Sequence, residues 1–136
     1  MNIKILTVLA GAFCVALTGC QTIQTGGVEV TVEEYGPMKL RVDDRHFAGQ
    51  ISVENAKLRR TDDGFIIADV LIRNCQAVDV CLEYKFSFYD SDGMSVQSGG
   101  RAWEQKVLHG GELVSLTATG PEKTVAKFVL RLRRTY

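Results

Sequence analysis

The stretch that decides the fold is FIIADVLIRNC, residues 65–75, together with VCLEYKFSFYDSDG, residues 80–93. In the first segment every second residue is apolar: Ile66, Ala68, Val70 and Ile72. In the second segment a mostly aromatic series takes the alternate positions: Leu82, Tyr84, Phe86 and Phe88. Because successive side chains of a strand point to opposite faces, this period of two predicts two strands that each bury one face.

The sequence allows two kinds of connection between these strands. In a hairpin with Cys75 opposite Cys81, Arg73 would meet Glu83 and Val70 would meet Phe86, so charge pairs with charge and core with core. A crossover between two sheets would also hold the cysteines together, but it would not produce these pairs. The pairing favours the hairpin, and the crossover stays open as the alternative.

Short segments on both sides of this pair also have the pattern of strands. They cover residues 28–34, 51–60, 103–107, 112–119 and the closing segment 125–136. Turn signals such as Asp62-Asp63-Gly64 separate them, whereas residues 35–50 give no legible pattern and no amphipathic helix is evident. About seven short strands bounded by turns predict an all-β sandwich.

The N-terminal stretch MNIKILTVLAGAFCVALTGCQ, residues 1–21, has one lysine followed by an uncharged, mostly apolar run over residues 5–17. This run is shorter than the roughly 20 residues that span a bilayer as a helix, and it has the proportions of a signal peptide. Its end, Leu17-Thr18-Gly19-Cys20, resembles the bacterial lipobox, which implies that Cys20 is acylated and becomes the first mature residue. The alternative is a cleavable secretory signal with an incidental Gly-Cys pair.

Residue 21 is glutamine rather than aspartate, which in the sorting rule of enteric-type bacteria implies the outer membrane, with the domain facing the periplasm. The predicted organisation is a lipoprotein signal peptide at 1–19, a lipidated flexible tether at 20–27 and a sandwich domain at 28–136.

Cys75 and Cys81 are predicted to form a structural disulfide, because thiols in an oxidising compartment tend to pair. Structural zinc requires four ligands at short spacings, which the chain does not supply. The spacing is not the C-x-x-C of a redox pair, and no histidine base lies nearby for a thiol nucleophile.

The charge balance argues against a nucleic-acid partner, because the formal net charge is zero and such a partner requires a basic surplus. His109, in His-Gly-Gly-Glu, has no nucleophile near it in the sequence, and we expect a solvated turn residue. Asp90 and Asp92 fit turn chemistry better than a calcium loop. We therefore predict no catalytic residues, no metal and no cofactor.

Three residues are candidates for binding. Trp103 is expected either to cap the core or to form an exposed anchor, and the core reading is favoured. Arg131 and Arg133 share one face of the last strand, where they suit anionic headgroups or glycan carboxylates. The simpler explanation for the arginines is an edge strand protected by charge.

The central segment resembles the YcfL family of small Gram-negative lipoproteins. The resemblance rests on Asp63-Gly64, residues 70–74, residues 84–90 with the Asp92-Gly93 turn, and residues 128–132; it covers roughly residues 50–134 and the lipobox. It implies an immunoglobulin-like sandwich with no assigned enzymatic activity. Genes of this family often lie beside that of a lipoprotein activating a peptidoglycan synthase. The cysteine pair departs from the family pattern.

We therefore expect a non-enzymatic, membrane-anchored lipoprotein that acts as a protein-interaction module in the cell envelope. The alternative is a ligand- or peptidoglycan-binding module. The expected partners are the bilayer, through acylated Cys20, and another envelope protein or peptidoglycan.

Overall fold

The computed structural model describes residues 27–96 and 102–135. Within them the chain forms eight strands and one short helix: β1 (Val28–Glu33), β2 (Lys39–Val42), α1 (Arg45–Gln50), β3 (Ile51–Arg60), β4 (Ile66–Asn74), β5 (Val80–Asp90), β6 (Glu104–Leu108), β7 (Leu113–Thr119) and β8 (Val125–Arg134). The signal peptide, Cys20 and residues 21–26 lie outside the described residues.

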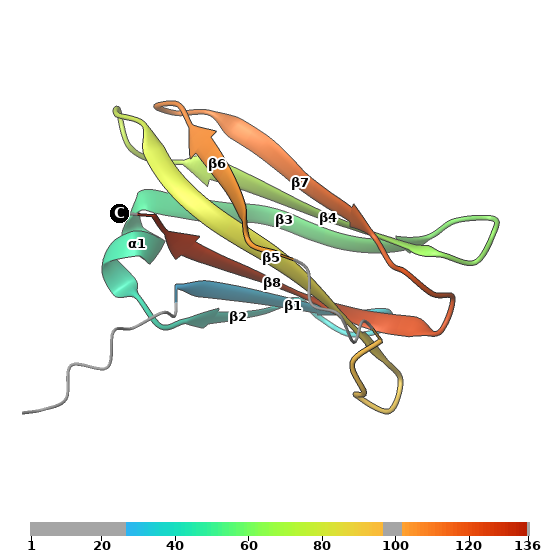
Figure 1. Ribbon diagram of the computed structural model, residues 1–136. Coiled ribbons are helices and arrows are strands. Elements are labelled where there is room, and N and C mark those ends of the chain that lie inside the picture. Colours follow the sequence, from blue (N-terminus) through green and yellow to red (C-terminus); the bar gives the residue numbers. More distant parts are fainter. Residues whose placement is uncertain (1–26, 97–101, 136) are drawn as a thin grey trace, which may run out of the picture.

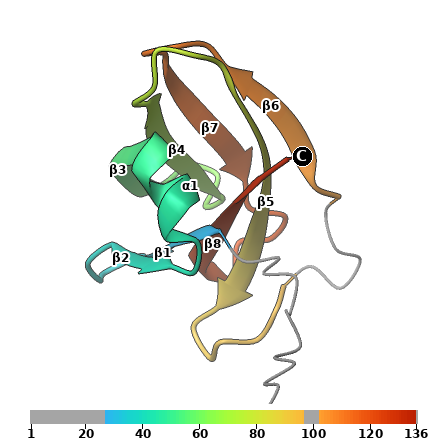
Figure 2. The ribbon, with the colours of Figure 1, turned by 90° about the vertical axis from the view of Figure 1, so that its left-hand side faces the viewer.

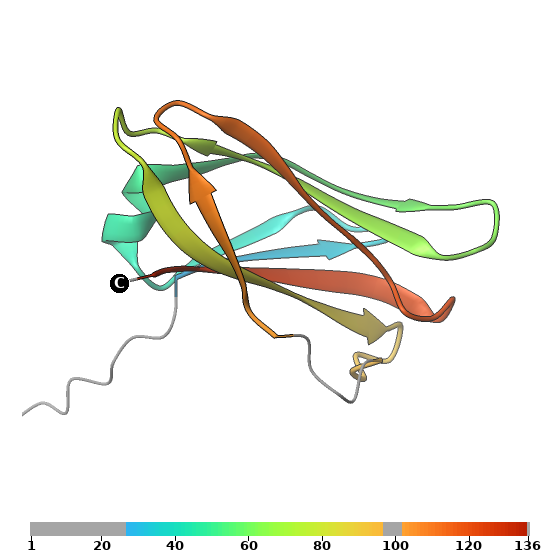
Figure 3. The same cartoon turned by 45° about the horizontal axis from the view of Figure 1, so that its top comes forward.

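The strands form two antiparallel sheets that pack face to face (Figure 1). The larger sheet has the order β2-β1-β8-β5-β6, and the smaller sheet has the order β3-β4-β7. Figure 3 shows the smaller sheet lying across the larger one. The predicted all-β sandwich is therefore confirmed, and the additional strand, β2, lies in the stretch 35–50 that gave no legible pattern.

The core forms where the inner faces of the two sheets meet. In β4 the four apolar residues predicted to share a face, Ile66, Ala68, Val70 and Ile72, are all 0% exposed. Across from them Phe86 of β5 and Phe128 of β8 place their ring centroids 5.9 Å apart. Full burial of such a side chain stabilises a fold by roughly 1.5–3 kcal/mol, so the alternation in these strands accounts for the sandwich.

The favoured hairpin between β4 and β5 is wrong, because the chain crosses between the two sheets at this point. β4 pairs with β3 and β7, and β5 pairs with β6 and β8. Arg73 bonds Glu54 at 3.2 Å rather than Glu83, which instead accepts from Arg133 at 2.7 Å. Complementary pairs therefore exist for both strands, but with other partners than the sequence suggested.

Asn74, a fully buried polar residue at the end of β4, organises this crossover. Its Nδ2 donates to the backbone carbonyls of Val78, Leu108 and His109 at 2.8–3.0 Å. Its Oδ1 accepts from the amide of Gln76 at 2.8 Å. These bonds satisfy the polar groups where the chain leaves one sheet for the other, as burial requires.

Cys75 and Cys81 flank the crossover and are both exposed and free. The structure contains no bond between them, so the disulfide stays a prediction from the compartment.

The stretch before β3 contains the helix α1, which the sequence did not reveal. Asp44 caps it by accepting from the amide of Phe47 at 3.1 Å, as N-cap residues do. Phe47 is 0% exposed and covers one end of the core. No helix among the described residues has the length and apolarity to cross a membrane.

Two of the expected turns have the backbone that they require. Gly64 and Gly93 adopt φ angles of +89° and +81°, a region that glycine enters without steric cost.

The last strand, β8, lies in the middle of the larger sheet. The reading of its arginines as protection for an edge strand is therefore wrong.

Candidate functional site

The chain enters the domain at a fixed point, Gly27. A side chain here would collide with the backbone of Leu132 and Arg133. The carbonyl of Gly27 accepts from the amides of Asp43 and Asp44 at 2.8 and 3.1 Å. Gly27 therefore belongs to the folded domain, one residue before the predicted boundary at 28. We call this end, where β1 starts and β8 finishes, the entry end.

Trp103, Arg131 and Arg133, the three predicted binding residues, come together on the outer face of the larger sheet at the entry end. The guanidinium of Arg133 lies 3.8 Å from the ring centroid of Trp103. Trp103 is only half-buried and does not belong to the core cluster, so the favoured core position is wrong. The central place of β8 brings its arginine beneath the indole, where cation–π attraction holds the pair.

These residues line a groove of about 270 Å³, which we call the Trp–Arg groove. Its lining also includes Arg41, Glu29 and Asp43, which the sequence analysis did not identify. They come from β1, β2 and the segment after β2, and only the register Glu29↔Arg41 and Glu29↔Arg131 reveals their proximity.

The arginines of the Trp–Arg groove are already paired with acids. Arg131 Nε lies 3.3 Å from Glu29, Arg133 Nε lies 2.7 Å from Glu83, and Arg41 Nε lies 3.1 Å from Asp43. An anion entering the groove would have to compete with these carboxylates. The groove offers stacking and hydrogen bonding rather than a strong positive field.

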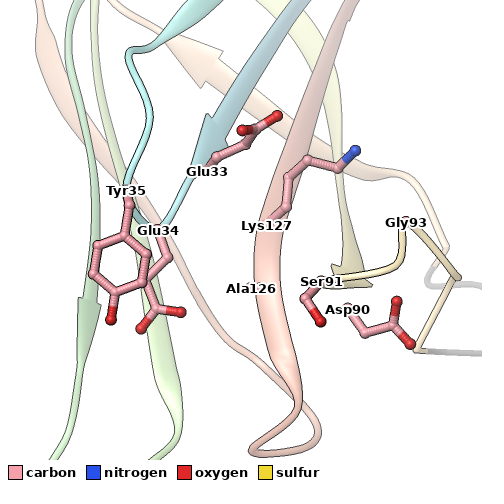
Figure 4. A pocket seen from close by; sticks show the side chains of 8 residues that line it. All are labelled: Glu33, Glu34, Tyr35, Asp90, Ser91, Gly93, Ala126 and Lys127. Atoms are coloured by element: carbon pink, nitrogen blue, oxygen red, sulfur yellow. The ribbon is translucent and has the colours of Figure 1, made fainter.

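A second groove, of about 360 Å³, lies at the opposite end of the domain (Figure 4). Its lining is Glu33, Glu34, Tyr35, Asp90, Ser91, Gly93, Ala126 and Lys127. Most of its charged groups have structural partners. Asp90 Oδ1 accepts from the amides of Asp92 and Met94 at 3.0 and 2.9 Å, which is the turn chemistry expected from the sequence.

Glu34, in the same groove, forms a bidentate ion pair with Arg60. Both nitrogen–oxygen distances are 2.8 Å. The hydrogen bond from Arg60 lowers the pKa of Glu34, and the bond to Glu34 raises the pKa of Arg60. Arg60 also donates to the carbonyls of Gly64, Lys123 and Val125. This pair therefore ties the ends of β3 and β1 together and connects them to two loops.

Four of the eight exposed large apolar side chains in the described part of the chain lie on the β1–β2 hairpin with its edge strand β2. Its exposed fractions are 97% for Tyr35, 43% for Met38, 50% for Leu40 and 41% for Val42. Leu40 and Val42 pair with Val30 and Val28, whose side chains are buried in the core. β2 therefore continues the inner face of the larger sheet into solvent. We call Tyr35, Met38, Leu40 and Val42 the hairpin surface.

His109 stands on the turn between β6 and β7, as expected. Its Nδ1 lies 3.2 Å from Asp79, and both side chains are exposed. No group of three His, Cys, Asp or Glu side chains in the described part of the chain is arranged to hold a metal ion.

Comparisons with known proteins give a family and a fold. The chain matches the family model described as "Protein of unknown function (DUF1425)" over residues 38–134. It is similar to the crystal structure, at 1.81 Å, of a DUF1425 family member from Shewanella sp. pv-4, with 26% identity and a TM-score of 0.58; the match covers 82% of this chain and 93% of that chain.

A second solved structure, Campylobacter jejuni cj0090, is similar in fold, with 18% identity and a TM-score of 0.55. That match covers 61% of this chain and 85% of the other. The comparison with curated proteins found no match. Since the family model spans residues 38–134, from β2 to the end of β8, the chain belongs to the DUF1425 family.

Proposed function

We propose that this chain is a non-enzymatic lipoprotein, anchored in the outer membrane through acylated Cys20, whose sandwich binds another envelope protein on the periplasmic side. The observation that carries the proposal is the hairpin surface, in which Leu40 and Val42 leave a core-type strand face exposed at 50% and 41%. The resemblance to the YcfL lipoproteins supports it, because that resemblance brings no catalytic positions.

Contiguous apolar side chains on a monomer surface commonly mark an interaction site. Edge strands are usually protected by charge, and β2 has Lys39 and Arg41 only on its outer face. Its inner face carries no charge. A partner that covers this face would remove apolar area from water at roughly 25 cal/mol per Å².

The tether limits how far the entry end can move from the bilayer in this proposal. Six residues lie between Cys20 and Gly27, and the seven Cα–Cα steps reach at most about 25 Å when extended. The entry end therefore stays near the bilayer. β1 runs away from that end, so Tyr35, at the tip of the hairpin, lies far from the point of attachment in this proposal.

The test is photo-crosslinking in cells that express the full-length chain. A photoreactive phenylalanine analogue replaces Leu40, and the matched control places it at Ser115, an exposed position of β7 in the other sheet. We expect a discrete adduct with one envelope protein from position 40 and none from position 115. If positions 35, 38, 40 and 42 all yield no adduct, the proposal is wrong. Incorporation of labelled palmitate, lost in Cys20→Ser, tests the anchor separately.

The Trp–Arg groove favours a second candidate function, the binding of peptidoglycan. An indole stacked over a guanidinium, with two more arginines beside it, suits a sugar ring that carries a carboxylate. The full chain in detergent should then sediment with purified sacculi, and Trp103→Ala should reduce the bound fraction while Lys106→Gln does not. If the wild-type chain stays in solution, this candidate is wrong.

A further inference from the structure

The two sheets differ in width on one side of the sandwich. β7 and β6, the edges on one side, follow each other in the chain and are joined by a short turn at residues 109–112. On the other side the smaller sheet ends at β3, whereas the larger sheet continues beyond β1 to β2. Figure 2 shows the β1–β2 hairpin projecting sideways below β3.

This difference leaves one strand position of the smaller sheet vacant. β3 pairs with β4 and with no other described strand, so one edge of its backbone has no ladder. β3 packs over β1. Neighbouring strands are about 4.8 Å apart in both sheets. A strand added beside β3 would therefore lie over β2, as β3 lies over β1.

The side chains around this vacant position are apolar on the inward side. By this placement Leu40 and Val42, 50% and 41% exposed, would lie below it, and Val53, Ala56 and Leu58 of β3 are half-buried. An added strand with apolar residues at alternate positions would bury both sets at once.

The outward side of β3 carries two cations in its second half, Lys57, which lies opposite Asp69 of β4, and Arg59. After a bulge between Val53 and Asn55, the strand pairs regularly from Asn55 to Arg60. Lys57 and Arg59 point outward from this regular half and are exposed. Neither forms an ion pair with another described residue. Opposite charges on neighbouring strands are stabilising, and like charges are destabilising.

We propose that β3 receives an extended segment of the partner protein as a fourth strand of the smaller sheet, and that this segment alternates apolar residues with aspartate or glutamate. Backbone hydrogen bonds along β3 give affinity in this mode, and the alternating side chains give specificity. The inference rests on the proposed protein-interaction function and specifies its partner. A second copy of this chain is a poor occupant, because antiparallel pairing of two β3 strands would bring Lys57 and Arg59 of both copies together.

The test uses the full chain in detergent and a labelled, end-capped peptide of alternating valine and glutamate. We expect saturable binding by fluorescence anisotropy, with protection of β3 amides in hydrogen exchange. A peptide of alternating valine and lysine should bind about tenfold more weakly, since two cross-strand charge pairs change sign. The double variant Lys57→Glu/Arg59→Glu should reverse this preference. The control Lys106→Glu/Lys123→Glu, with the same charge change elsewhere, should keep it.

The proposal is overturned if the valine–glutamate peptide does not bind, if the β3 charge reversal leaves its preference unchanged, or if the protected amides lie outside β3. Self-association through this edge, detected by sedimentation without peptide, would also overturn it. A partner crosslinked from Leu40 whose binding ignores the β3 variants would refute strand addition and leave the proposed function intact. Peptide binding at β3 without any cellular adduct would refute only the proposed function.

Discussion

β4 and β2, which belong to opposite sheets, both direct apolar side chains inward but differ in how far these are buried. In β4 Ile66, Ala68, Val70 and Ile72 are 0% exposed, whereas in β2 Leu40 and Val42 remain 50% and 41% exposed. Both strands direct these residues toward the space between the sheets. The difference arises from the opposite layer, because β4 faces the five-stranded sheet and β2 extends beyond the three-stranded one.

The comparison shows that alternation in a strand determines which side chains face inward but not whether anything covers them. Coverage depends on how many strands the other sheet provides. An alternating strand that stays uncovered is therefore more informative about partners than one that is buried.

The largest expected effect compares one apolar truncation in each strand. Ile72→Ala should lower the free energy of unfolding by about 3–4 kcal/mol, because it leaves a cavity in a closed core. Leu40→Ala should change it by no more than about 0.5 kcal/mol, as surface substitutions do. Denaturant titration of both variants checks this. Comparable losses would mean that β2 is covered in solution.

Asn74, the buried polar residue at the end of β4, gives the next largest effect on the free energy of unfolding. Asn74→Ala leaves the carbonyls of Val78, Leu108 and His109 without their donor. We expect a loss of about 2–3 kcal/mol, since unsatisfied buried polar groups are costly. Asn55→Ala, at an exposed position of β3, is the control and should be nearly neutral. An equal effect of the two substitutions would contradict the role of Asn74 at the crossover.

The predicted disulfide would constrain the connection between β4 and β5, directly after the buried strand β4. If Cys75 and Cys81 are bonded in cells, reduction should lower the free energy of unfolding by roughly 2 kcal/mol, as expected for a short loop. Mass spectrometry after alkylation without reductant measures the bond directly. Two alkylated thiols in protein from the envelope would show that the prediction is wrong.

The smallest effect concerns the ion pair between Glu34 and Arg60, at the ends of β1 and β3. Because Arg60 lowers the pKa of Glu34 from 4.5, the stabilising contribution of Glu34 is present above pH 4.5 and is lost as the pH falls through the lowered value. Glu34→Gln should lower the Tm slightly at neutral pH and have no effect in acid. Thermal melts of both proteins across this range check the prediction. A difference in Tm between wild type and variant that stays constant with pH would contradict the prediction.

Much of the sandwich was predictable because β4, β5 and β8 alternate strongly. Most side chains of their inner faces, such as Ile66, Phe86 and Leu132, are buried as expected, whereas Tyr84 is only partly buried. The partners of these strands were not predictable. Arg73 finds an acid in Glu54, and Glu83 finds a base in Arg133, so complementary charge alone does not select one register among several.

The candidate site was predictable in its components and not in its arrangement. Arg131 and Arg133 share a face because they are two residues apart in a strand. That Trp103 stacks on Arg133 depends on the central place of β8, which the sequence does not specify. The hairpin surface was missed although Met38, Leu40 and Val42 alternate with Lys39 and Arg41, because β2 is only four residues long and the stretch around it has mixed charge.

If the chain is anchored at Cys20 as proposed, the fixed position of Gly27 has a mechanical consequence. A pull from a membrane anchor would enter β1 along its axis, and β1 is bonded on one side to β2 and on the other to β8. Such a load shears both ladders at once instead of peeling them open one bond at a time. The strand that receives the force is therefore flanked on both sides by partners that share it.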